Sequence, residues 1–248
     1  MMSFNLLTYN LHKGFTAGNR RFVLHDIRRA IQATTADIVL LQEVQGEHRR
    51  HSKQRADWPT QTQFEYLADD LWSHYAYARN AVYPNGHHGN AVLSRCPIDY
   101  WHNLNVSKRR YASRSLLHTR IMIEAEQPVD VICVHLGLTE GERNQQYAQL
   151  EHYIHTKINA DAALIIAGDF NDAFQKAAIC LEHQLGMREA HKEIYGEYAR
   201  SFPARFPIMR VDRIYFQNLK LDYCHRLNGP LWRRLSDHIP LQAGFSLR

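Results

Sequence analysis

A chain of 248 residues fits one large α/β domain, and 45% hydrophobic residues are enough to build a substantial core. With 22% charged residues and no internal repeat or low-complexity tract, the composition excludes fibrous, repeat and disordered proteins. The formal net charge of +5, with 16 histidines outside the count, favours an anionic partner such as nucleic acid, a phospholipid surface or a phosphorylated small molecule.

The cysteines and the amino-terminal residues indicate the compartment. Cys96, Cys133, Cys180 and Cys224 are widely spaced and form no Cys-x-x-Cys pair, so we expect reduced thiols. The chain enters a strand-like run at residue 4, without a basic region followed by a long apolar stretch. We therefore expect a cytoplasmic protein without a signal peptide or a transmembrane segment, and we expect it to be a monomer.

In the first half of the chain, short β-rich runs alternate with amphipathic segments. Residues 4–9 predict a strand, and residues 21–34 predict a helix with Val23, Ile27, Ala30 and Ile31 on one face. Residues 38–41 form a continuous apolar run, which is expected of a strand covered on both faces. Residues 61–72 predict a helix, and strands are predicted at 91–93, 116–124 and 129–134.

In the second half, Thr139 and Glu142 predict a capping box, followed by Tyr147, Leu150 and Ile154 on one helical face. Residues 163–167 predict a buried strand, 174–184 a helix, and 211–216, 219–227 and 239–247 three further strands. The polar, basic segments 46–59 and 100–114 are predicted to be loops, and the glycines of 86–90 predict a turn.

Five short polar strings stand at the ends of apolar runs. They are Thr8-Tyr9-Asn10, Leu41-Gln42-Glu43, Gly168-Asp169-Phe170-Asn171, Val211-Asp212-Arg213-Ile214 and Ser236-Asp237-His238. An unpaired carboxylate is costly to bury, so several strands that end this way predict one shared site at the edge of a sheet. A hard divalent cation takes one or two carboxylates together with water and substrate phosphate. The strings therefore indicate metal-assisted phosphoester hydrolysis.

The identity and order of these strings resemble the endonuclease/exonuclease/phosphatase superfamily of Mg²⁺-dependent phosphoesterases, from Asn10 to His238. The segments 168–171 and 236–238, preceded by Gln42-Glu43, carry most of the resemblance, and the segments 89–94 and 134–136 strengthen it. It implies one catalytic domain over residues 1–248 with an α/β (α+β) fold, a four-layer sandwich of two facing, mainly antiparallel β-sheets flanked by helices.

The resemblance also implies the metal ligands. Glu43 would be the main carboxylate for Mg²⁺, and Asn10 and Asp237 would complete its coordination. Mn²⁺ would be able to substitute, because carboxylate and amide oxygens suit both ions.

Catalytic roles follow from the same resemblance. Asp169 would orient or deprotonate the attacking water, and Asn171 would hold a non-bridging phosphate oxygen. His238 would lie against the phosphate with its ring fixed by Asp212, and His135 would line the opposite side. A phosphate diester resists attack because its oxygens are negative, so a metal ion, an imidazolium and an aspartate base are what hydrolysis requires.

Local explanations compete at each position. Asn10 could cap the following turn, Glu43 could pair with an arginine of the basic segment after it, and Asp212 could pair with Arg213. All of them would have to hold together to dismiss the site. A zinc site is not favoured, because His87 and His88 lack partners at compact spacing, and no Gly-x-Ser-x-Gly motif marks a serine nucleophile.

Basic clusters at 48–55, 108–111 and 232–234 suggest the substrate. Basic residues interleaved with aromatics suit nucleic-acid backbones and stacked bases, so DNA or another nucleic acid is the favoured substrate. We expect Arg114, Asn90 and Tyr111 to contact it. One alternative is a phospholipid headgroup or an inositol phosphate, with peripheral contact to anionic lipid. A different class would be a non-catalytic module that binds an anionic polymer.

Overall fold

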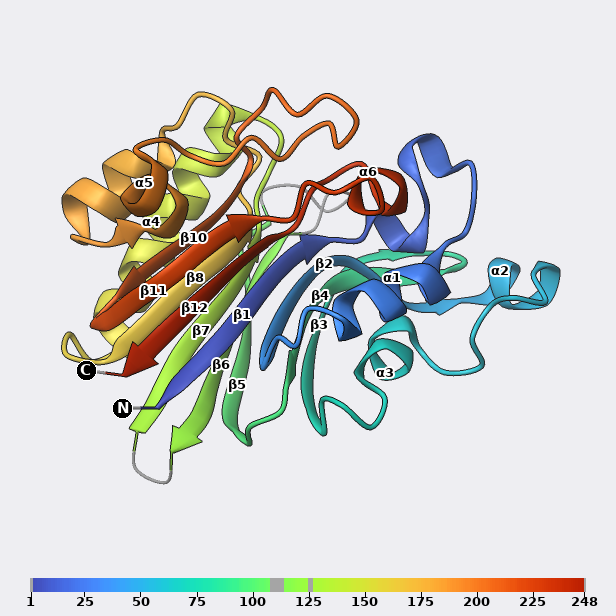
Figure 1. Ribbon diagram of the computed structural model, residues 1–248, viewed down its shortest axis with the longest axis horizontal. Helices are drawn as coiled ribbons and strands as arrows, with labels where there is room; N and C mark the ends of the chain where they lie inside the picture. The colour runs from blue at the N-terminus through green and yellow to red at the C-terminus, as the bar shows by residue number, and fades with distance from the viewer. Residues whose placement is uncertain (1, 108–113, 125–126, 248) are drawn as a thin grey trace.

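The computed structural model describes residues 2–107, 114–124 and 127–247, in which twelve strands form two six-stranded sheets (Figure 1). The first sheet has the order β11 (Leu219–Arg226), β12 (Leu241–Leu247), β1 (Ser3–Asn10), β2 (Ile38–His48), β4 (Gly86–Ser94) and β3 (His74–Tyr83). The second has the order β5 (Ile98–Asn105), β6 (Ser115–Glu124), β7 (Gln127–His135), β8 (Ala163–Asp169), β10 (Asp212–Gln217) and β9 (Arg188–Glu189).

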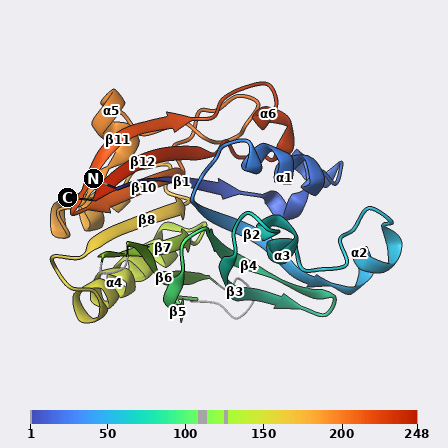
Figure 2. The same cartoon turned by 60° about the horizontal axis from the view of Figure 1, so that its bottom comes forward.

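Helices pack against the outer faces of the sheets or, like α2 (Arg49–Gln54), lie at their ends (Figure 1). They are α1 (Leu24–Gln32), α2 (Arg49–Gln54), α3 (Gln63–Ala68), α4 (Glu140–Lys157), α5 (Ala190–Tyr195) and α6 (Trp232–Leu235), with 3-10 turns at His12–Gly14 and Ala17–Asn19 and a π-helical turn at Ile179–Gln184. Figure 1 and Figure 2 show α1 and α3 on one side of the paired sheets and α4 on the other. The predicted four-layer sandwich of two facing, mainly antiparallel sheets is therefore confirmed; only β1–β2 and β7–β8 pair in parallel within the described residues.

Burial on both faces explains the continuous apolar runs. In β1, Phe4 and Leu6 point between the sheets, whereas Leu7 and Tyr9 point outward to the cluster that contains Ile27 of α1. The outer face of the second sheet packs in the same way against α4, through Tyr147, Leu150 and Ile154. Because both faces are covered, these strands need apolar residues at every position rather than at alternate ones.

Several predicted boundaries were wrong. The loop expected at 46–59 contains the end of β2 and helix α2, and the loop expected at 100–114 begins as β5, a largely exposed edge strand. The turn expected at 86–90 lies inside β4, where Gly86 and Gly89 face backbone carbonyls of neighbouring strands so closely that no Cβ would fit. Only residues 177–184 of the helix expected at 174–184 are helical, and β3, β9, α5 and α6 were not predicted.

The other predicted elements are present. Thr139 caps α4 and accepts a hydrogen bond from the Glu142 backbone nitrogen (3.4 Å). All four cysteines are free thiols, as expected. None of the helices in the described ranges combines the length and the apolar character needed to cross a bilayer.

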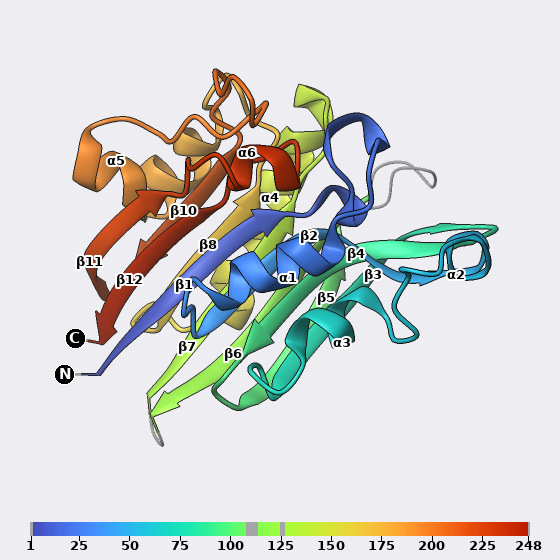
Figure 3. The ribbon, with the colours of Figure 1, turned by 45° about the vertical axis from the view of Figure 1, so that its right-hand side comes forward.

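The strand register brings the polar strings to one edge of the sandwich. In the second sheet Asp169 is directly opposite both His135 of β7 and Asp212 of β10. In the first sheet Asn10, at the end of β1, pairs with Gln42 of β2. Figure 3 shows this edge beside α6, at the end of the strands opposite to both chain termini.

Glu189, which caps α5, makes the stability of the fold depend on pH. Its carboxylate is buried and accepts hydrogen bonds from the backbone nitrogens of Lys192 (2.7 Å) and Ile214 (3.4 Å). Burial raises the pKa of Glu189 from its ordinary 4.5 to about 7. Between these values the unfolded chain has lost the proton that the folded chain keeps, so the stabilisation is complete below pH 4.5 and is lost as the pH rises through 7.

We therefore expect the free energy of unfolding to fall by about 3 kcal/mol across this pH window, and Glu189→Gln to remove most of that fall. Urea denaturation at a series of pH values measures both quantities. An identical pH dependence in the two proteins would show that Glu189 titrates normally.

Candidate active site

Asp169 is the centre of the site, where groups from both sheets converge. Asn10 Nδ2 donates to Asp169 Oδ2 (3.1 Å), and the Asn171 backbone nitrogen donates to Oδ1 (2.9 Å). The Nε2 atoms of His135 and His238 lie 3.6 and 3.7 Å from Oδ2. Burial raises the pKa of Asp169 to about 6, against the lowering effect of His238. A carboxylate whose pKa is raised toward neutrality, and which is held in place by several hydrogen-bond donors, is suited to accept a proton.

Gly168 permits the carboxyl end of β8 to approach β7 closely. Its φ is +144°, and a Cβ built there would lie 2.0 Å from the carbonyl oxygen of Val134. Only glycine tolerates this φ value and this close contact together, which explains why a glycine precedes Asp169 in the motif.

His238 is held by Asp212. Its Nδ1 lies 2.8 Å from Asp212 Oδ2, and the ring packs 4.9 Å from that of Phe202. Burial alone would lower the pKa of His238, but Asp212 and Asp169 outweigh it and raise the pKa to about 10. His238 is therefore an imidazolium at neutral pH, with its Nε2 hydrogen directed toward Asp169.

His135, in contrast to His238, is neutral. Arg114 Nη1 lies 3.4 Å from His135 Nδ1, and a guanidinium can only donate, so Nδ1 accepts and Nε2 carries the hydrogen. Burial, together with the positive charge of Arg114, holds the pKa of His135 well below 6.5. The site thus combines one neutral and one charged imidazole, both directed at the same carboxylate.

A buried ion pair holds the loop that follows β8. Arg213 Nη1 lies 3.2 Å from Asp172 Oδ2, both side chains are fully buried, and Nη2 donates to the Asp172 carbonyl (2.6 Å). Arg213 therefore pairs with Asp172 rather than with the adjacent Asp212. The loop in turn positions Asn171, whose Nδ2 donates to the carbonyl oxygen of Leu136 (3.0 Å).

Glu43 lies on an irregularity of β2. The pairing of β2 with β4 shifts register between Leu41 and Val44, and Glu43 has a φ of +55°. A bulge next to a site redirects a side chain away from the ladder. Glu43 Oε2 lies 3.0 Å from Lys13 Nζ, so its partner is this lysine and not an arginine of the basic segment. Burial opposes ionisation of Glu43, but the attraction of a protonated His135 and of Lys13 outweighs it and lowers the pKa of Glu43. With His135 neutral, Lys13 is the cation that faces Glu43.

The turn that carries Lys13 follows Asn10, which the sequence already offered as its cap. His12, Lys13 and Gly14 are consecutive left-handed residues, with φ values of 46°, 59° and 80°. Left-handed residues usually occur singly, because each non-glycine residue costs roughly 1–2 kcal/mol. The turn starts where Asn10 Oδ1 accepts a hydrogen bond from the His12 backbone nitrogen (3.0 Å). Asn10 thus caps this turn, as its local explanation expected, and contacts Asp169 with the same amide.

The predicted metal ligands suit a hard divalent cation. The carboxylates of Glu43 and Asp237 both face the ring of His12, whose Nδ1 lies 4.0 and 3.3 Å from their nearest oxygens, and both side chains are partly exposed. Together with the amide of Asn10 they form an oxygen donor set of the kind that Mg²⁺ and Mn²⁺ prefer. Asp169, Asp212 and His238 also cluster, with one ligand atom each within 4.8 Å, but a protonated His238 has no lone pair for a metal.

The predicted substrate residues fall in three different places. Arg114, at the start of β6, lies beside His135 in the site. Asn90 is fully buried beneath it, where Nδ2 donates to the carbonyl oxygens of Ser115 (3.1 Å) and Cys133 (3.4 Å). Tyr111 and the cluster at 108–111 lie outside the described residues.

A fold of two facing sheets with a carboxylate, amide and histidine site at one edge defines the class of protein. A sequence profile of the Endonuclease/Exonuclease/phosphatase family matches residues 7–238, and the chain belongs to this family. It is 46% identical over 246 residues to the uncharacterized protein YbhP of Escherichia coli K12, covering 99% of this chain and 97% of YbhP.

Solved structures agree with this fold. An endonuclease/exonuclease/phosphatase from Beutenbergia cavernae superimposes with a TM-score of 0.77 at 17% identity, covering 99% of this chain and 72% of that one. D. rerio TDP2 complexed with single-strand DNA product gives a TM-score of 0.68 at 17% identity, covering 98% and 99%. The resemblance seen in the sequence is confirmed, and members of this superfamily are phosphoesterases, typically dependent on divalent metals.

Proposed function

We propose that this protein is a divalent-metal-dependent phosphodiester hydrolase, with a nucleic acid strand as its favoured substrate. The observation that carries the proposal is the arrangement around Asp169, a buried carboxylate with a raised pKa beside a His238 imidazolium fixed by Asp212. A non-catalytic binding module has no use for such an arrangement, because burying these charges costs free energy without helping to bind a polymer.

The residues divide the reaction between them. Asp169 accepts a proton from the attacking water while the water oxygen bonds to phosphorus and the bond to the leaving oxygen breaks. The imidazolium of His238 offsets negative charge on the phosphate oxygens, and the neutral His135 donates to them from Nε2. Glu43, Asp237 and Asn10 would hold Mg²⁺, which supplies further positive potential at the phosphate.

Charge and fold favour nucleic acid as the substrate. The net charge of +5 attracts a polyanion, and the DNA product in the TDP2 structure shows that this fold can accommodate a single strand. His48, His51 and Arg55 lie with Phe15 and Lys13 around a cavity of about 510 Å³ beside Glu43. Such a combination of rings and cations suits stacked bases.

A phospholipid headgroup is the second candidate, because apolar side chains are exposed beside the catalytic edge. Phe206, Ile208 and Leu231 are 79%, 68% and 54% exposed, on two segments that precede His238 in the chain. The first segment contacts the site, because the Ala204 backbone nitrogen donates to the Asp237 carbonyl oxygen (2.7 Å). Ile208 and Leu231 are aliphatic and do not stack on bases, whereas all three apolar side chains can enter the interface of a membrane. A cytoplasmic location and a monomeric state stay predictions.

Parallel assays decide between these substrates. We expect release of nucleotides from single-stranded DNA with Mg²⁺ and its loss in EDTA, and little release of headgroups from phospholipid vesicles. Headgroup release alone would favour the second candidate. If neither substrate is turned over with Mg²⁺ or Mn²⁺, the proposed activity is wrong.

Glu43→Gln tests the role of Glu43 as a metal ligand, independently of the role of Asp169 as the catalytic base. The substitution removes a carboxylate charge, so we expect the Mg²⁺ concentration for half-maximal activity to rise about tenfold or more, with partial rescue at high Mg²⁺. Mg²⁺ titration of the wild type, Glu43→Gln and the control Glu47→Gln on the same strand measures this. Equal metal dependence in all three proteins would show that Glu43 is not a ligand.

A further inference from the structure

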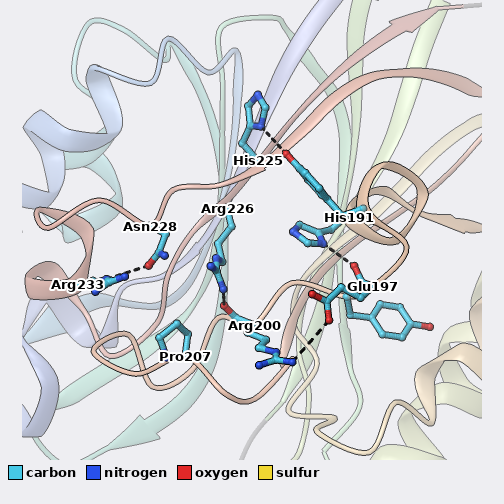
Figure 4. A pocket seen from close by; sticks show the side chains of 10 residues that line it. His191, Glu197, Arg200, Pro207, His225, Arg226, Asn228 and Arg233 are labelled. Atoms are coloured by element: carbon cyan, nitrogen blue, oxygen red, sulfur yellow. Dashed lines mark hydrogen bonds and ion pairs between the residues drawn. The ribbon is translucent and has the colours of Figure 1, made fainter.

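A second basic pocket lies between α5, the end of β11 and α6, outside the catalytic cluster. It encloses about 740 Å³, and its lining includes Arg200, Arg226, Arg233, His191 and His225. Figure 4 shows these side chains arriving from separate segments of the chain to surround one cavity.

The positive charge of this pocket is not balanced by its own lining. Among the described residues that line it, Glu197 is the one carboxylate, and its Oε2 lies 2.8 Å from Arg210 and 3.9 Å from Arg200. Arg226 donates to the backbone carbonyl oxygen of Arg200 (2.8 Å), and Arg233 donates to the side-chain oxygen Oδ1 of Asn228 (3.0 Å). These contacts orient the guanidinium groups but leave their charges uncompensated.

The arginines repel one another. Burial lowers the pKa of Arg226, and the charges of Arg233 and Arg200 lower it further. A cluster of like charges at a partly buried position is unfavourable by itself, and an anion relieves the cost. Guanidinium groups suit phosphate in particular, because their planar donors bind two oxygens at once.

The pocket is connected directly to the catalytic edge. Arg226 pairs in register with Leu241, which is three residues from His238 and therefore at most about 11 Å along the chain. Arg200 precedes Ser201, whose carbonyl accepts a hydrogen bond from the Ile239 backbone nitrogen (2.9 Å). One substrate can therefore reach both places.

We propose that this arginine pocket is a second phosphate-binding subsite, which holds a phosphate of the nucleic acid strand whose scissile phosphate lies at Asp169 and His238. The inference rests on the proposed function and narrows it to substrates with at least two phosphate groups. A substrate with a single diester would use the catalytic cluster alone.

The double variant Arg200→Gln/Arg233→Gln tests the subsite, because both side chains are exposed and make few contacts. We expect kcat/KM for a single-stranded oligothymidylate to fall about tenfold or more, since charge-assisted hydrogen bonds are lost. Hydrolysis of bis(4-nitrophenyl) phosphate, which has one phosphate, should change less than about twofold. Arg95→Gln, at the opposite end of the sandwich beside Asp37, is the control that should alter neither.

Binding gives a readout that does not depend on turnover. Oligothymidylate binding to Asp169→Asn protein, with and without the double substitution, should show the slope of log K against log salt reduced by about 0.7 per lost contact. Equal losses on both substrates, or an unchanged salt slope, would overturn the subsite. Loss of binding to phosphatidylglycerol vesicles with unchanged oligothymidylate binding would also overturn it, in favour of lipid.

The two proposals can fail separately. If the wild type hydrolyses neither substrate, the proposed function fails. The salt dependence of oligothymidylate binding still decides whether the arginines contact phosphate.

Discussion

Asp169→Asn is expected to lower turnover by roughly 10²–10⁴-fold, because asparagine cannot accept the proton of the attacking water. Thermal stability should change little. Burial already disfavours the ionised form of Asp169, and the asparagine oxygen can still accept from Asn10 or from the Asn171 backbone. Steady-state kinetics on single-stranded DNA and a thermal melt measure the two effects.

Asp161→Asn is the matched control for this prediction. Asp161 is exposed just before β8 begins, at the end of the strand opposite to Asp169, so the same chemical change there should leave turnover unaltered. Turnover within about threefold of the wild type in Asp169→Asn would rule out the general-base role, since that role contributes at least about a hundredfold.

Arg213→Met is expected to destabilise the fold by about 3–5 kcal/mol, because it leaves the fully buried carboxylate of Asp172 without its charged partner. The loop from Asp169 to Asp172 should loosen with it, so activity should fall even at temperatures where the protein stays folded. Urea denaturation gives the stability loss, and kinetics below the transition give the activity loss.

The double variant Arg213→Met/Asp172→Asn distinguishes ion pairing from simple packing. Asparagine keeps an acceptor for the Ala177 backbone nitrogen, which donates to Asp172 in the wild type (2.6 Å). The double variant should therefore cost less than the sum of the two single variants, by about 0.5–3 kcal/mol. Strictly additive losses would mean that the two charges do not depend on each other.

The sequence predicted which strand ends converge better than it predicted the loops around them. The apolar runs that end in Asn10, Glu43 and Asp169 marked strands whose polar ends meet, since burial makes such ends costly unless they share a purpose. The resemblance to the family implied the catalytic and metal-binding roles of these residues. In contrast, β5 is an edge strand that exposes aromatic as well as polar residues, so no alternation of apolar and polar positions distinguished it from a loop.

Other features depend on contacts that no local pattern encodes. The pairing of Arg213 with Asp172 joins residues 41 positions apart, whereas the sequence offered the adjacent Asp212 as the obvious partner. The bulge at Glu43 and the left-handed turn at Lys13 are backbone conformations that these residue types adopt only when the surrounding structure requires them. The arginine pocket draws its charges from three separate segments, and of the two predicted basic clusters that the structure describes, only 232–234 contributes to it.

The hydrogen bond from Asn10 to Asp169 joins the edge of one sheet to the edge of the other, so the site lies across the boundary between the two sheets. Its dimensions are set by the thickness of the apolar layer in between, in which Leu6, Ile165 and Phe245 interleave. Adding or removing a methyl group there would translate one sheet against the other and shift Asp169 relative to Glu43. Catalytic rate in this protein should consequently respond to interior substitutions far from any ionisable group, and natural variation in that layer would tune the rate without altering a single site residue.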